Sequence, residues 1–106
     1  MTNIYVVFNI ETHTPIFSFK TATEAYQYLE DMIVDEKNNE MSMIHLDRSM
    51  AAQDKNKAIK KTEDIYDAAL DRLEASYKWF CNSEGLKYFE VDEYTVYEVP
   101  ISEGRI

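Results

Sequence analysis

Few side chains in this 106-residue chain are of types that could do chemistry, and their spacing does not favour it. His13 and His45 lie far apart, and no cysteine, histidine or carboxylate stands at metal-ligand spacing beside either. We therefore expect His13 to be a turn histidine and His45 to be partly buried. No metal site and no cofactor are predicted.

The two candidate nucleophiles, Cys81 and Ser42, also lack the surroundings that catalysis needs. Cys81 falls near the end of a predicted helix, where the helix dipole disfavours a thiolate, so we expect a buried or half-buried thiol. Ser42 precedes His45 by three positions without an oxyanion-hole loop or nucleophile elbow. We predict no catalytic residue, and the chain is not expected to be an enzyme.

The positions of the glycines also argue against an enzyme. The only glycines are Gly85 and Gly104, so none is available for a dinucleotide loop, a phosphate loop or a nucleophile elbow before position 85. These large enzyme classes are therefore nearly excluded.

Four carboxylates at helical spacing form the first candidate binding feature, which we call the acidic ridge: Asp64, Asp67, Asp71 and Glu74. Like charges three or four positions apart cost a few tenths of a kcal/mol per pair in a helix. Lys60 and Lys78 flank the ridge. Two interpretations stand: a solvated helix face, or a docking face for a basic partner.

Trp79 is the second candidate. At about 100° per residue it points away from the apolar stripe through Tyr66, Leu73 and Tyr77. Either a second layer of the fold covers it, or it is an exposed aromatic anchor for a partner.

The elements that position these residues begin with a hairpin. Strand-forming residues at 4–10 and 16–19 flank a polar turn, and Thr21 to Glu24 fits a capping box that opens a helix. That helix is expected to end in the polar stretch 35–39. Residues 41–46 are either a short strand or a lead-in to the next helix.

A long amphipathic helix is predicted from position 47 or 49 to position 82, with Gly85 as its cap, although the part before Ile59 could be a separate helix. Residues 86–99 return to strand periodicity, with a bulge or bend near Asp92 and Glu93. We predict one α+β domain over 1–106. Its antiparallel sheet has three strands, or four if residues 41–46 form one. An N-terminal helix and the long helix pack on one face of the sheet, so the order of elements is β-β-α-(β)-α-β. The first strand is expected at the centre, and 16–19 or 94–99 at an edge.

Charge restricts the partners. The chain has 20 acidic and 11 basic residues, a net charge of −9, which opposes binding to DNA, RNA or anionic membranes and favours a basic protein surface. A single cysteine, with no signal-peptide pattern and no membrane-length apolar run, predicts a cytoplasmic protein.

The strand, turn, strand and helix opening at 4–33 and the Tyr- and Glu-rich strand at 86–99 resemble small bacteriophage accessory proteins. The likeness covers about half of the chain, and no site residue follows from it. It implies a phage-encoded protein in the host cytoplasm that binds a host protein and inhibits or redirects it. The net charge of −9 adds that the target has a basic surface, such as the nucleic-acid groove of a defence nuclease or polymerase, and that the acidic ridge mimics nucleic acid. The alternatives are a small domain acting on nucleotides or metabolites, and a self-assembling subunit; a homodimer through the sheet edge or the helix also stays open.

Overall fold

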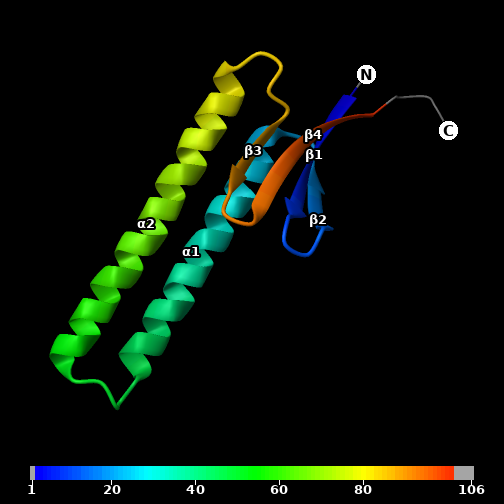
Figure 1. Ribbon diagram of the computed structural model, residues 1–106. Coiled ribbons are helices and arrows are strands. Elements are labelled where there is room, and N and C mark those ends of the chain that lie inside the picture. Colours follow the sequence, from blue (N-terminus) through cyan, green and yellow to red (C-terminus); the bar gives the residue numbers. More distant parts are fainter. Residues whose placement is uncertain (1, 102–106) are drawn as a thin grey trace.

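The computed structural model describes residues 2–101, which form a four-stranded antiparallel sheet and two long helices (Figure 1). The strands are β1 (Thr2–Asn9), β2 (Thr14–Phe19), β3 (Tyr88–Val91) and β4 (Tyr94–Ile101). The helices are α1 (Ala22–Leu46) and α2 (Ala52–Asn82). The α+β class is as predicted. A helix at the N-terminus is not seen, because the chain opens with two strands and α1 comes third.

The sheet order is β2-β1-β4-β3. β1 lies inside the sheet between β2 and β4, as the β-branched and aromatic residues of the first strand predicted. β2 is an edge, whereas the expectation that 94–99 could be an edge is wrong: β4 pairs with β1 on one side and with β3 on the other.

The fourth strand comes from the segment 86–99, which was expected to be one bent strand. Val91 pairs with Tyr94, so Asp92 and Glu93 form a tight turn between β3 and β4. Asp92 has a φ of 52°, a left-handed conformation that Asp tolerates in turns. The predicted bulge or bend near Asp92 and Glu93 is therefore a reversal of the chain between two strands.

α1 begins as the capping box predicts. The Glu24 N–H donates to Thr21 Oγ1 at 3.2 Å, and the Thr21 hydroxyl donates to the Glu24 carboxylate at 2.9 Å. The expected end at 35–39 and the alternative strand at 41–46 are both wrong, because the helix runs on to Leu46. Its polar second half is held by α2: Lys37 pairs with Asp67 at 3.2 Å, and the Tyr66 hydroxyl donates to Glu40 at 2.7 Å.

α2 is a single helix rather than two, and it starts at Ala52, after a loop in which the Asp47 carboxylate accepts the Ser49 N–H at 2.8 Å. The Ser49 hydroxyl also donates to this carboxylate, and the hydrogen bonds from the hydroxyl and the N–H of Ser49 lower the pKa of Asp47. At the other end the helix stops at Asn82 with Ser83 as its C-cap, and Gly85 takes a φ of 84° in the turn toward β3.

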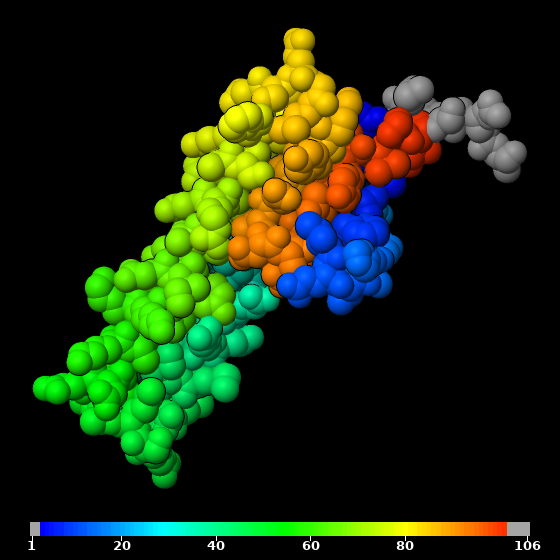
Figure 2. Space-filling view, in the orientation of Figure 1, coloured from blue at the N-terminus to red at the C-terminus, as the bar shows by residue number. Residues whose placement is uncertain are grey.

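The buried core lies where the helices meet the sheet. It consists of Val7, Ala25, Leu29, Ile33, Ala69, Leu73, Phe89, Val91 and Val96. Beyond this core the two helices continue as a pair without the sheet, which makes the molecule 62 Å long and 28 by 21 Å across (Figure 2). We call this projecting pair, residues 36–62, the helical arm.

Candidate functional site

The acidic ridge lies on the exposed side of α2, and three of its four carboxylates form ion pairs with lysines. Asp67 pairs with Lys37 of α1, Asp64 with Lys60 at 3.7 Å, and Glu74 with Lys78 at 2.9 Å. Asp71 is exposed, and it forms no ion pair within residues 2–101. All four side chains therefore reach solvent, but Asp67 also joins the two helices.

Trp79 is 68% exposed, so no second layer covers it in the described part of the chain. It lines a pocket of about 240 Å³ between the end of α2 and β3, which we call the aromatic pocket. The pocket is formed by Ser76, Trp79, Leu86, Tyr88 and Glu90. The Glu90 N–H donates to Ser76 Oγ at 2.9 Å, which ties the outer edge of β3 to the helix.

A second depression joins the aromatic pocket through Ser76 and Glu90, and its other lining residues are Arg72, Val91 and Asp92. Arg72 pairs with Asp92 at 2.9 Å. The helix position of Trp79 predicted that it points away from the apolar stripe, and of the two alternatives left open the structure shows the exposed one. Its neighbours Tyr88 and Glu90 were missed, because they come from β3, which was not recognised as a separate strand.

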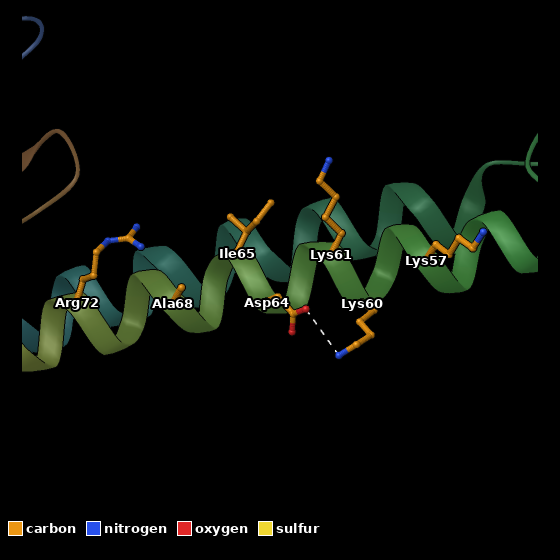
Figure 3. A pocket seen from close by; sticks show the side chains of 7 residues that line it. All are labelled: Lys57, Lys60, Lys61, Asp64, Ile65, Ala68 and Arg72. Carbon is orange, nitrogen blue, oxygen red and sulfur yellow. Dashed lines mark ion pairs between the residues drawn. The ribbon is translucent and has the colours of Figure 1, made fainter.

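The outer face of α2 carries a basic and apolar strip (Figure 3). Lys61 and Ile65 project to one side, while Lys60 turns the other way to pair with Asp64. An open depression follows this strip, and its lining is Lys57, Lys60, Lys61, Asp64, Ile65, Ala68 and Arg72. All of these residues belong to one helix, so the strip is a helix surface rather than an enclosed cavity.

The sheet face opposite the helices is apolar and partly exposed. The pairing of Val7 with Val96 places both side chains toward the helices, so the neighbouring residues of β1 and β4 point the other way. We call this surface the open sheet face: Ile4, Val6, Phe8, Tyr88, Tyr97 and Val99. Tyr97 contacts Phe8 and Tyr88, with ring centroids 6.2 Å from each. The sequence did not reveal this surface, because residues 86–99 were expected to form one strand with a bulge or bend near Asp92 and Glu93, whereas they form two paired strands.

The candidates for catalysis lie apart. His13 is exposed in the β1–β2 turn with a φ of 55°, as expected of a turn residue. The expected partial burial of His45 and of Cys81 is wrong, because both are exposed. His45 lies on the helical arm beyond the core, and Cys81 is about 100° around the helix axis from Phe80, which packs against Tyr5 and Phe89. Ser42 is exposed on α1. Among residues 2–101 no group of three His, Cys, Asp or Glu side chains could hold a metal ion.

Several tyrosines are held in their neutral form. The hydrogen bond to Glu40 raises the pKa of Tyr66 to about 12, helped by burial and by the charges of Glu40 and Glu36. Burial raises the pKa of Tyr5, and Glu98, which accepts its hydroxyl at 3.2 Å, adds to the effect. Asn3 and Lys87 also contact Glu98, so this half-buried carboxylate joins side chains of β1 and of the segment before β3 to β4.

Within residues 2–101 no helix is long and apolar enough to cross a bilayer. Comparison of the chain with protein-family models, with curated proteins and with solved structures found no match.

Proposed function

We propose that this protein is a non-enzymatic binding protein that docks on a basic surface of a protein partner. In the phage-type setting implied by the sequence resemblance, the partner is a host protein in the host cytoplasm, which the binding inhibits or redirects. The observation that supports this best is the exposed Trp79 on the same helix as the acidic ridge. By helical geometry Asp64 and Asp71 lie within about 80° of Trp79 around the axis of α2.

This combination is typical of an interface. Tryptophan is enriched among the residues that dominate binding energy, and charge complementarity speeds association and orients the partner. The lysines that accompany the ridge do not prevent this, because exposed ion pairs contribute only about 0–1 kcal/mol. A basic partner can therefore replace Lys60 and Lys78 as the counter-charge.

The test is to neutralise the ridge without disturbing the helix pair. We expect the variant Asp64→Asn, Asp71→Asn, Glu74→Gln to lose capture of the partner from lysate at low salt, while its melting temperature stays within a few degrees of wild type. Asp67 is left intact because its pair with Lys37 joins α1 to α2. Captured proteins are identified by mass spectrometry.

The matched control removes three exposed acids elsewhere, Glu11→Gln, Asp54→Asn and Glu84→Gln, so that net charge changes equally. This control should capture the same partner as wild type, and added salt should weaken both. Equal binding by the ridge variant, or binding that does not respond to salt, would exclude the ridge as the docking face.

The open sheet face supports a second candidate, a self-assembling subunit. Tyr88, Tyr97 and Val99 on this face are each about two-fifths exposed. Such an apolar surface would be covered if two copies stacked their sheets. Sedimentation at several concentrations tests this directly: a dimer that Tyr97→Lys dissociates supports self-assembly, and a monomer at every concentration contradicts it.

A further inference from the structure

The aromatic pocket contains a carboxylate without a counter-charge. Glu90 lines the pocket, is exposed, and forms no ion pair with any lysine or arginine of residues 2–101. Arg72, which lines the adjoining depression together with Glu90, pairs with Asp92 at 2.9 Å, and Lys87, three positions before Glu90, pairs with Glu98 at 3.5 Å. Negative charge in the pocket is therefore available to a ligand.

Two aromatic side chains stand beside this carboxylate. Trp79 comes from α2 and Tyr88 from β3, so the rings approach the pocket from different elements. The face of an indole or phenol ring attracts a cation, and tryptophan does so most strongly. The hydrogen bond from the Glu90 N–H to Ser76 Oγ holds the strand against the helix, so the backbones that carry the two rings and the carboxylate stay side by side.

We propose that the aromatic pocket binds an organic cation, and that this cation is the guanidinium of an arginine side chain on a protein partner. Arginine fits better than a quaternary ammonium because its planar group stacks on an aromatic face while its N–H groups donate to a carboxylate. A quaternary ammonium has no N–H and would leave Glu90 without a hydrogen-bond donor. The inference rests on the proposed function, since it names the side chain of the basic partner that docks beside the ridge.

Trp79 is the only tryptophan of the chain, so its fluorescence reports on this pocket alone. The probes are N-acetylarginine amide, its neutral analogue N-acetylcitrulline amide, and tetramethylammonium chloride, all at constant ionic strength. We expect the arginine probe to change the emission saturably with a Kd on the order of millimolar. The citrulline probe should give no saturable change. A linear response to all three probes, or saturation by tetramethylammonium alone, would overturn the assignment to arginine.

Two variants locate the binding. Glu90→Gln and Tyr88→Leu should each weaken the arginine probe about 5- to 10-fold, because each removes one of the groups that contact the cation. Glu11→Gln removes the same charge from the β1–β2 turn and should leave the Kd unchanged. Circular dichroism melting confirms that each variant is folded, and if one fails to fold the other still decides the matter. An equal Kd in Glu90→Gln and Glu11→Gln would refute the role of Glu90.

The two proposals can fail separately. If the arginine probe does not bind but the ridge variant still loses its partner, the pocket assignment is wrong and the proposed function stands. If the arginine probe binds Trp79 and Glu90 but no ridge-dependent partner is found, the pocket assignment stands without the docking face.

Discussion

Leu73 is the residue at which α2 meets the sheet, and its side chain has no exposure to solvent. We expect Leu73→Ala to lower the free energy of unfolding by about 2–5 kcal/mol, because a buried leucine leaves a cavity when it is truncated. For a domain of this size that is a large share of the total stability. Urea unfolding followed by circular dichroism measures it.

Leu46→Ala is the matched control. Leu46 is 79% exposed at the end of α1, so the same truncation should change stability by only a few tenths of a kcal/mol. Equal losses at both positions would mean that the helical arm is packed differently from the structure described here.

Tyr66 gives the molecule a response to alkaline pH. Its pKa is raised from 10.0 to about 12 in the folded state, so the unfolded chain gives up this proton at lower pH than the folded protein. The stabilisation is complete below pH 10 and is lost as pH rises toward 12. We therefore expect Tyr66→Phe to lose less stability than wild type over that interval, as measured by urea unfolding at each pH.

Glu40→Gln extends the test, because it removes the charged acceptor of the Tyr66 hydroxyl. Tyrosinate absorbance should then show Tyr66 ionising at a lower pH than in wild type. The same pH slope in wild type and Tyr66→Phe would show that this hydrogen bond has no energetic role.

At the scale of elements, the polar stretch of α1 is helical although its composition is unfavourable. Asn38 and Asn39 are exposed on this helix, and asparagine has a lower helix propensity than alanine. Replacing both with alanine should raise the free energy of unfolding by about 1 kcal/mol. Thermal and urea unfolding measure the change.

Asn9→Ala provides a control of opposite sign. The Asn9 side chain accepts the N–H groups of Glu11 and Thr12 at 3.0 and 3.2 Å in the β1–β2 turn, so the same replacement should destabilise the protein there. If Asn38→Ala with Asn39→Ala proved neutral or destabilising, α1 would not be continuous through this stretch.

The local signals in the sequence predicted the elements better than their extents. The Thr21 capping box and the alternation of 16–19 depend on neighbours in the chain, and they were correct. The continuation of α1 past position 35 depends on Lys37 and Glu40 contacting α2, about 30 residues away, which local propensity does not include. For the same reason the sequence indicated that Trp79 points away from the apolar stripe, but not that it is exposed or that Tyr88 and Glu90 line a pocket with it.

At the scale of the whole molecule, the helical arm makes the protein unusually extended. Its radius of gyration is 17.5 Å, whereas a compact domain of this length has about 13 Å. The buried apolar residues of both helices lie at the sheet end, between Ala25 and Ile33 on α1 and between Ala69 and Leu73 on α2. Stability should therefore be unevenly distributed along the helices.

We expect amide hydrogens in residues 36–62 to exchange faster than those in 24–34 and 66–80, because the arm can open without exposing the core. Hydrogen exchange measured by mass spectrometry gives the rates, and small-angle scattering gives the radius of gyration. Uniform protection along both helices, or a radius near 13 Å, would contradict the projecting arm.

The two edges of the sheet differ, and the difference limits how the protein could polymerise. The outer edge of β3 is tied to α2 through Ser76, while the β2 edge has no strand beside it in the described part of the chain. Sheets grow into filaments only when each copy offers two free edges, one for each neighbour. With one free edge, strand pairing between copies can only join β2 to β2 across a two-fold axis, and such a pair has no edge left to recruit a third copy.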